Sequence, residues 1–289
     1  MRPGQLAFRE APIGRGEAYA YPRSMASSEV ATVGSGSAVR LRGLTRRFGD
    51  KVAVAGVDLD VPDGSFFGLV GPNGAGKTTL LSMTTGLLRP DSGSVEVAGA
   101  DVWQDAAAAK ARIGVVQDTP ALFDRLTGSE LLAFHGALRR LDPATVRDRS
   151  EELLRVLDLA VDADRLVVDY SLGMTKKLAL AAALLHAPRV LFLDEPFGAI
   201  DPVSTNVIEQ LLHRFVAGGG TIVFSSHVMD VVERLCDRVA VILRGRIVAA
   251  GTRDEVAPGG DLRAAFFKLV GAREDVGLEE LEWLGSSSG

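Results

Sequence analysis

The hydrophobic and polar residues of the chain follow two kinds of pattern, one typical of β-strands and one typical of α-helices. Residues 38–44 and 52–61 alternate apolar and polar positions, which predicts two strands. Residues 65–70 form an apolar run that predicts a buried strand. Residues 189–193 are continuously apolar, as expected of a parallel strand that is buried on both faces.

The remaining segments continue the alternation of strands with helices. Further strands are expected at 94–98, 113–116 and 221–226, with a hairpin over 238–250. Helices are expected at 80–88, 106–111, 150–159, 175–185, 203–215 and 228–236. A further helix is expected to start at 126, with Thr127 as its cap. This order predicts an α/β fold with a mostly parallel, helix-covered sheet and a β-rich N-terminal part that we expect to be antiparallel.

The composition divides the chain into one ordered domain and two end segments. We expect residues 38–260 to form the domain, with a mainly helical subdomain at about 118–186. Residues 1–37 mix Gly, Pro, Ser, Ala and Arg without periodicity and are expected to be a disordered tail, in which Met25 is an alternative start. Residues 261–289 are expected to form a C-terminal helix, near 276–284, and a tail.

Composition and charge narrow the classes of function. The 289 residues are 47% hydrophobic and 24% charged, as in ordinary soluble globular proteins. The net charge of −5 implies no general affinity for nucleic acid. The single cysteine, Cys236, has apolar neighbours at helical spacing and is expected in the core. Neither a membrane-spanning run nor a secretory signal is found, so we expect a cytoplasmic protein that reaches a membrane through a partner.

A glycine-rich loop follows the apolar run 65–70 and precedes an expected helix, which is the context that a phosphate-binding loop requires. Its glycines let backbone N–H groups converge on one point, and its lysine adds a positive charge for the β- and γ-phosphates. A threonine hydroxyl of the loop is a candidate Mg²⁺ ligand. A glycine-rich turn that matches by chance is the alternative. The loop residues are Gly71, Pro72, Asn73, Gly74, Ala75, Gly76, Lys77, Thr78 and Thr79.

Two adjacent carboxylates, Asp194 and Glu195, end the apolar strand at 189–193. The carboxyl ends of strands face the ligand crevice in open α/β sheets. Neighbouring carboxylates are unfavourable there without a cation, and Mg-ATP supplies one. We therefore expect Asp194 to hold the metal and Glu195 to polarise the attacking water. A helix-capping pair ahead of Pro196 is the alternative.

Other polar and aromatic residues add to this site. Gln117 ends one expected strand and can reach metal or water, while His227 ends another and can contact the γ-phosphate. Phe48 either packs inside the N-terminal sheet or stacks on an adenine ring. The other histidines fall inside expected helices and are interpreted as structural or surface residues: His135, His186 and His213.

A second candidate anion site precedes the helix expected at 175–185. Ser171 and Gly173 place a hydroxyl and a small backbone unit at that helix N-terminus. A plain N-cap by Ser171 is the alternative. One chain rarely needs two phosphate sites, unless the second serves a neighbouring copy.

Taken in order, these motifs resemble the ATP-binding cassette ATPases, the nucleotide-binding subunits of ABC transporters, over residues 38–255. Phe48 corresponds to the adenine-stacking aromatic position, where tyrosine is more frequent. The matched motifs are the Walker A loop at 71–79, the Q-loop at Gln117, the signature at 170–174, Walker B at 191–195, the D-loop at 198–201 and the switch His227.

The resemblance implies a P-loop NTPase fold, ATP and Mg²⁺ as cofactors, and ATP hydrolysis coupled to transport. Two cassettes would pair head to tail, with a homodimer favoured and a heterodimer left open. The other implied partner is a separate integral membrane permease, which would hold the chain at the cytoplasmic face of the membrane. The implied catalytic residues are Glu195, His227, Gln117 and Lys77. The implied metal ligands are Thr78, Gln117 and Asp194. Ser171, Gly173 and Asp201 would contact nucleotide across the pair.

The signature departs from the usual Leu-Ser-Gly-Gly-Gln at Tyr170, Leu172 and Met174. This form resembles the cassettes of small-molecule exporters with separate membrane subunits, so export is favoured while the substrate stays open. A soluble cassette ATPase of translation or DNA repair is the alternative, although such members usually carry two cassettes or a long coiled-coil insertion. An unrelated P-loop kinase would lack the signature and the switch histidine.

Overall fold

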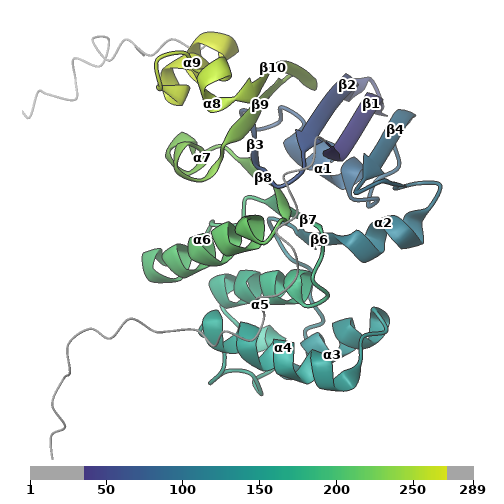
Figure 1. The fold of residues 1–289 in the computed structure, drawn as a ribbon, viewed down its shortest axis with the longest axis vertical. Helices are drawn as coiled ribbons and strands as arrows, with labels where there is room; N and C mark the ends of the chain where they lie inside the picture. The colour runs from purple at the N-terminus through teal and green to yellow at the C-terminus, as the bar shows by residue number, and fades with distance from the viewer. Residues whose placement is uncertain (1–35, 272–289) are drawn as a thin grey trace, which may run out of the picture. The chain divides into compact units, whose positions relative to one another are not determined.

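A computed structural model describes residues 36–271, which contain two β-sheets and the helices packed on them (Figure 1). The larger sheet, sheet B, has six strands in the order β10-β9-β3-β8-β7-β6. Its strands from β9 to β6 are parallel, and β10 pairs antiparallel with β9. Their bounds are β3 Phe66–Val70, β6 Ile113–Val116, β7 Val190–Asp194, β8 Thr221–Ser226, β9 Arg238–Leu243 and β10 Arg246–Thr252.

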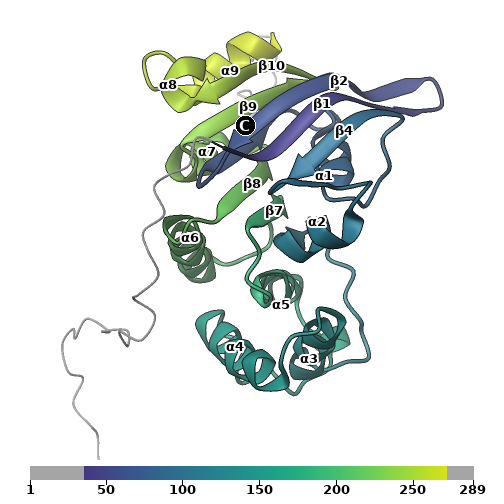
Figure 2. The same cartoon turned by 45° about the vertical axis from the view of Figure 1, so that its right-hand side comes forward.

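The smaller sheet, sheet A, contains the N-terminal strands and has the order β2-β1-β4-β5. All of its pairings are antiparallel. Figure 2 shows β1, β2 and β4 running side by side in front of α1. Their bounds are β1 Ser37–Phe48, β2 Lys51–Pro62, β4 Ser92–Val97 and β5 Ala100–Asp101. The α/β fold with one mostly parallel and one antiparallel sheet is therefore confirmed.

The central strands of sheet B, β3, β7 and β8, are buried on both faces, which explains the continuous apolar runs of β3 and β7. In β7, Leu191 and Leu193 belong to one hydrophobic cluster, whereas Val190 and Phe192 belong to the other. The first cluster lies under the helices, and the second includes the inner face of sheet A. The two-sided core fixes the register of the central strands, and with it the positions of the residues at their carboxyl ends.

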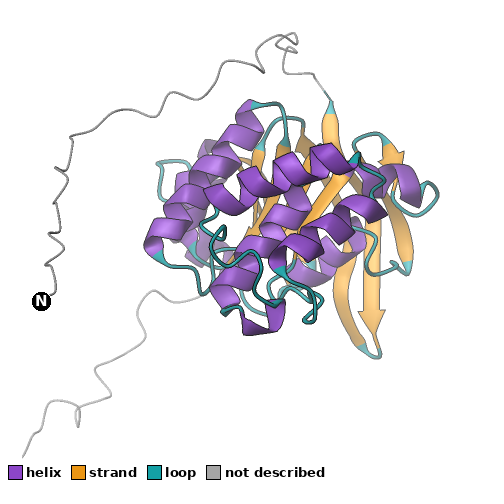
Figure 3. Ribbon diagram, turned by 90° about the horizontal axis from the view of Figure 1, so that it is seen from below, coloured by secondary structure: helices purple, strands orange, loops and turns teal. Residues whose placement is uncertain are grey.

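The helices gather mainly on one side of the strands (Figure 3). Helix α5 packs against β6 and carries α3 and α4 on its other side (Figure 1). The helices are α1 Lys77–Thr84, α2 Ala106–Arg112, α3 Gly128–Leu138, α4 Pro143–Val156, α5 Leu172–Leu184, α6 Pro202–Ala217, α7 Met229–Leu235, α8 Arg253–Val256 and α9 Leu262–Val270, with a short 3₁₀ turn, η1, at Val167–Asp169. Within 36–271, no helix combines the length and apolar character needed to cross a bilayer.

Several expected helix boundaries were wrong. Helix α1 spans 77–84 rather than 80–88, because it starts directly after Gly76, so that Lys77, Thr78 and Thr79 of the glycine-rich segment form its first turn. Helix α4 begins at Pro143 rather than 150, since Asp142 caps it by accepting a hydrogen bond from the backbone of Thr145 at 3.0 Å. The polar first turns of α4 concealed its start. Helices α8 and α9 were not expected.

Other expectations have mixed outcomes. Thr127 caps α3 in a reciprocal arrangement with Glu130, as expected. Cys236 is buried, and burial raises the pKa of its thiol, which agrees with a core role. His186 lies just beyond the end of α5, not inside a helix. Most of the tail expected at 1–37 lies outside the described residues, as does the whole of the helix expected near 276–284.

Candidate functional site

The glycine-rich segment 71–79 runs from the carboxyl end of β3 into the first turn of α1, and close packing requires glycine at Gly71 and Gly76. A Cβ on Gly71 would lie 2.4 Å from the backbone oxygen of Ile242. Gly76 has φ +111°, and a Cβ there would lie 2.5 Å from the backbone oxygen of Ala53. The loop is therefore held tightly against the neighbouring backbone, with the N-terminus of α1 at its end.

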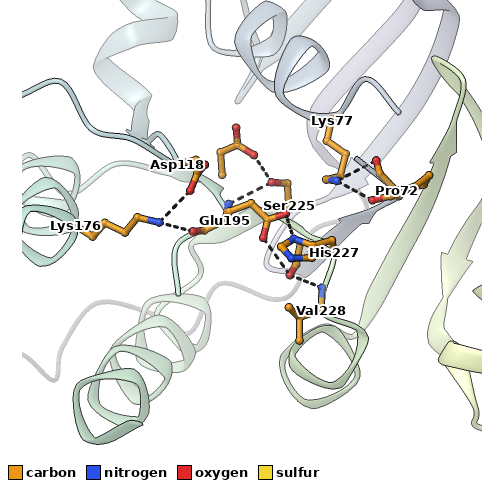
Figure 4. Close-up of polar contacts among 11 residues, drawn as sticks. Pro72, Lys77, Asp118, Lys176, Glu195, Ser225, His227 and Val228 are labelled. Atoms are coloured by element: carbon orange, nitrogen blue, oxygen red, sulfur yellow. Dashed lines mark hydrogen bonds and ion pairs between the residues drawn. The ribbon is translucent and has the colours of Figure 1, made fainter. Parts of the chain in front are cut away.

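Lys77, the first residue of α1, is buried and turns back over the loop. Its Nζ donates hydrogen bonds to the backbone oxygens of Gly71, at 2.7 Å, and Pro72, at 3.4 Å (Figure 4). Burial lowers the pKa of Lys77, and the carboxylates of Glu195 and Asp194 act in the opposite direction. These two carboxylates therefore favour the charged lysine, which is the form that attracts phosphate oxygens.

A cavity of about 300 Å³ joins the loop to Phe48 and to the carboxyl ends of the central strands. The Phe48 side chain is 47% exposed, so it is not packed inside sheet A. The guanidinium of Arg46 lies 4.9 Å from the centre of its ring. The cavity is lined by Phe48, Lys51, Ala53, Asn73, Gly74, Ala75, Gly76, Lys77, Thr78, Thr79, Asp118, Asp194 and Glu195.

A second cavity of about 300 Å³ contains the three residues proposed as metal ligands, Thr78, Gln117 and Asp194. They come from α1, the segment after β6 and the end of β7. Asp194 is buried and accepts a hydrogen bond from the Ser225 hydroxyl. A hydroxyl, an amide oxygen and one carboxylate suit Mg²⁺, which usually binds one or two carboxylates together with substrate phosphates. The donor set therefore fits Mg²⁺ together with a nucleotide.

Glu195 stands at the end of β7 with its carboxylate directed toward His227 (Figure 4). The Nδ1 of His227 lies 2.8 Å from Oε1 of Glu195, and the Ser226 hydroxyl lies 3.5 Å from Oε2. Glu195 has φ +46°, which side-chain-bearing residues rarely adopt. Strained backbone of this kind is often found at functional sites.

Ser171 and Gly173 form the start of α5, away from the two cavities. Ser171 caps α5, because its Oγ accepts a hydrogen bond from the backbone N–H of Met174 at 3.2 Å. A Cβ on Gly173 would lie 2.8 Å from the backbone oxygen of Ala199, so glycine lets α5 approach that segment. Among the described residues, those lining the two cavities do not include Ser171 or Gly173.

Asp201, the other residue expected to act across a pair of chains, caps α6. Its Oδ1 accepts hydrogen bonds from the backbone N–H groups of Val203, at 3.0 Å, and Ser204, at 2.9 Å. The side-chain hydrogen bond from Ser204, together with these backbone N–H groups, lowers the pKa of the Asp201 carboxyl. Like Ser171, Asp201 thus has a local structural partner and does not line either cavity.

Three residues near the site were missed by the sequence analysis. Asp118 lines both cavities, and its place directly after Gln117 was the available signal. Ser225 is a buried hydroxyl in an apolar strand, two residues before His227. Lys176 is one of two adjacent buried lysines in the mostly apolar helix α5, and no local pattern indicates what it contacts.

Comparison with known proteins agrees with this geometry. The sequence model of a family described as "ABC transporter" matches residues 54–198. The daunorubicin resistance ATP-binding protein DrrA3 of Streptomyces coeruleorubidus is 40% identical over 253 residues, which are 87% of this chain and 77% of that protein. The Nod factor export ATP-binding protein I of Ralstonia nicotianae is 38% identical over 224 residues, 78% of this chain and 70% of that protein.

The fold also matches solved structures. A structure described as the ATP-binding subunit of an ABC transporter superimposes with a TM-score of 0.77 and 26% sequence identity. The match covers 81% of this chain and 99% of that one. The similarity therefore extends over nearly the whole of that subunit.

Proposed function

The chain belongs to the family of ABC transporter ATP-binding proteins, and from that premise we propose that it is the ATP-hydrolysing subunit of an exporter whose membrane-spanning part is a separate protein. The observation that carries this proposal is the convergence of the phosphate loop, Asp194 and Glu195 on one cavity. A phosphate-binding surface and a candidate general base then meet in the same place.

ATP would enter with its adenine against the exposed face of Phe48 and its phosphates along the loop 71–79. The loop offers backbone N–H groups and the positive end of α1 to the phosphate oxygens. Lys77 would exchange its hydrogen bonds with Gly71 and Pro72 for the β- and γ-phosphates. The exchange keeps the buried ammonium paired, so its burial is compensated in both states.

We propose that Thr78, Gln117 and Asp194 hold Mg²⁺ together with the nucleotide, because all three line one cavity. When bound, the ion neutralises charge on the β- and γ-phosphate oxygens. Ser225 keeps the Asp194 carboxylate in place through its hydrogen bond. The hydroxyl of Ser225 would thus orient a side chain that holds the metal.

Glu195 is proposed as the general base of hydrolysis. Its carboxylate accepts the proton of a water molecule that attacks the γ-phosphorus, and the bond from that phosphorus to the β–γ bridging oxygen breaks. The Nδ1 of His227 lies 2.8 Å from Oε1 of Glu195. With ATP present, the His227 ring can donate a hydrogen bond to a γ-phosphate oxygen and so place the phosphate opposite Glu195.

Ser171, Gly173 and Asp201 are proposed to complete the site of a second cassette. They lie outside both cavities of their own chain, and Leu172 between the first two is exposed. An exposed helix N-terminus suits an anion that another molecule presents. Two chains paired head to tail would enclose each ATP between the loop of one chain and the Ser171 segment of the other.

An exposed apolar surface on the helical part is the proposed contact with the membrane protein. The Phe123 and Phe134 rings meet edge to face at 5.1 Å, and both side chains are exposed. Leu138, which lies on α3 together with Phe134, is exposed as well. Leu122 packs beside them against the hydrophobic core. Exposed aromatic clusters of this kind often mark protein interfaces. Leu122 and Phe123 come soon after Gln117 and Asp118 in the chain, so this part of the surface is placed to transmit changes at the nucleotide.

The direction of transport rests on the relatives. The two similar proteins are named for daunorubicin resistance and for Nod factor export. One name states export, and resistance to a compound agrees with its outward transport, so export of a small molecule is the direction we propose.

Copurification tests the transport proposal. A tagged chain expressed in its native cells should recover one integral membrane protein from detergent-solubilised membranes. Phe123→Asp should reduce that recovery at least about fivefold, because a charge replaces an apolar contact. Val161→Asp is the matched control, since Val161 is an exposed apolar residue after α4 and outside this surface. Recovery from the soluble fraction alone, without a membrane partner, would contradict the proposal.

A further inference from the structure

Lys176 is a buried cation that the mechanism above does not use. It lies on the second turn of α5 and its side chain is only 3% exposed. An ammonium group at such a depth is costly unless hydrogen-bond and charge partners surround it. The partners that the chain provides therefore indicate what this lysine holds in place.

The Lys176 ammonium joins two segments that are far apart in sequence (Figure 4). Its Nζ donates to Oδ1 of Asp118 at 3.0 Å, in the segment after β6. It also donates to the backbone oxygen of Glu195 at 2.9 Å, at the end of β7. A Cβ on Gly198 would lie 3.1 Å from the same Nζ, so the absence of a side chain there leaves room for the ammonium.

The backbone of Glu195 needs this support, because it occupies the left-handed region with φ +46°. On one side, its N–H donates to the backbone oxygen of Ser225 at 3.2 Å. On the other side, its carbonyl oxygen accepts from Lys176, and the next residue is Pro196, which has no N–H to contribute. The two anchors fix both peptide units of Glu195, and with them the direction of its carboxylate.

We propose that Lys176 is a positioning residue for ATP hydrolysis. It holds Glu195 in the backbone conformation that aims its carboxylate at the attacking water. Through Asp118 it ties that conformation to the segment that begins at Gln117. This inference rests on the proposed role of Glu195 as the general base.

The neighbouring lysine provides a matched control. Lys177 is also buried on α5, but its Nζ lies 3.5 Å from the backbone oxygen of Asp158, in the helical part of the chain. Lys176→Met and Lys177→Met each remove one buried ammonium from the same helix turn. A general effect of losing a buried lysine would appear in both variants, whereas a positioning effect on Glu195 would appear in the first alone.

The experiment measures ATP turnover and ATP affinity of the full chain. Lys176→Met should lower kcat on the order of 10- to 100-fold, since small misplacements of a catalytic group cost up to that much. The Kd for ATP should stay within about threefold, because Lys176 does not line the nucleotide cavity. Lys176→Arg, which keeps a cationic donor, should recover part of kcat, and Lys177→Met should stay within about threefold of the parent.

A crystal structure of nucleotide-free Lys176→Met gives a readout that does not depend on turnover. We expect Glu195 to leave the left-handed region and its carboxylate to lose the 2.8 Å contact with His227. An unchanged Glu195 in that structure would overturn the inference, as would equal losses of kcat in Lys176→Met and Lys177→Met. If Glu195→Gln itself kept full turnover, the proposed general base would fail instead, which separates the two claims.

Discussion

The N-termini of α1 and α5 are both candidate anion sites, but their surroundings differ. Helix α1 starts after Gly76, which has no side chain to occupy the free N–H groups, and it faces a cavity that holds Lys77 and two carboxylates. Helix α5 starts after Ser171, whose hydroxyl already accepts a hydrogen bond from Met174. Its next residue, Leu172, is 51% exposed.

The difference between the two helix starts leads to the proposal that one chain contains one complete site and one half-site. The first would have its phosphate surface, metal ligands and base from α1 and the ends of three strands, whose residues line the two cavities. The second has a helix terminus with Ser171 and Gly173, which line neither of these two cavities. If two copies pair, the half-site of each chain would complete the α1 site of the other chain, so that each ATP would contact both chains.

The largest expected effect comes from breaking the complete site. Lys77→Ala should lower ATP turnover by at least about 100-fold, because it removes the cation that the phosphates of ATP would meet. Steady-state ATPase assays with the membrane partner present measure this loss. Lys268→Ala, which removes an exposed lysine from α9, should leave turnover unchanged. A fully active Lys77→Ala variant would remove the phosphate-loop assignment.

Glu195→Gln should separate binding from chemistry at the same site. The amide keeps the size of the side chain but cannot accept the proton, so kcat should fall about 10²- to 10⁴-fold. The Kd for ATP, measured by fluorescence titration, should change little. Glu151→Gln on the exposed face of α4 is the control. Hydrolysis at the parent rate would show that another group acts as the base.

Ser171→Asp should sharpen the distinction between a helix cap and a half-site. Aspartate caps helices as well as serine does, so the free energy of unfolding should stay within about 0.5 kcal/mol. Its negative charge would oppose the phosphates of a partner's ATP, so turnover should fall about tenfold. Ser171→Asn, a neutral cap, is the control. Equal turnover in the parent and Ser171→Asp would reduce Ser171 to its capping role.

The smallest expected effect lies at the other end of α5. Burial and the nearby Arg139 lower the pKa of His186 to about 4, and the ring contacts the backbone oxygen of Ile113 at 3.0 Å. The unfolded chain therefore binds more protons than the folded one between pH 6.5 and 4, so stability falls as the pH drops through that range.

Urea denaturation at pH 7.5 and pH 5.5 tests this effect. The parent should lose about 1 kcal/mol more stability than His186→Gln over this interval, since glutamine does not titrate. Such a result would show that α5 is anchored to β6 by a neutral histidine. Identical pH dependence in the two proteins would mean that His186 is not held in its neutral form.

The parallel sheet and the phosphate loop could be predicted because local sequence determines them. Strands that are buried on both faces are continuously apolar, as in β7. In the loop, neighbouring backbone comes so close to Gly71 and Gly76 that only glycine fits there. The N-caps Thr127 and Ser171 were found for the same reason, since a cap acts within three residues.

The connection around Lys176 could not be predicted, because it depends on tertiary structure. Lys176 lies 58 residues from Asp118 and 19 from Glu195, and nothing in the local pattern specifies which backbone oxygen a buried lysine meets. The same holds for Gly173, whose close neighbour is the backbone of Ala199. The start of α4 was missed because its first turns expose polar side chains on most sides.

The mass of Glu195→Gln in solution tests the pairing of complete site and half-site most directly. With saturating ATP and Mg²⁺, analytical ultracentrifugation of the full chain should show twice the mass of one chain. Without nucleotide, it should show the mass of one chain. Adding Ser171→Asp to this variant should restore the single mass with ATP bound. A variant that binds ATP yet keeps the mass of one chain at all concentrations would contradict the account.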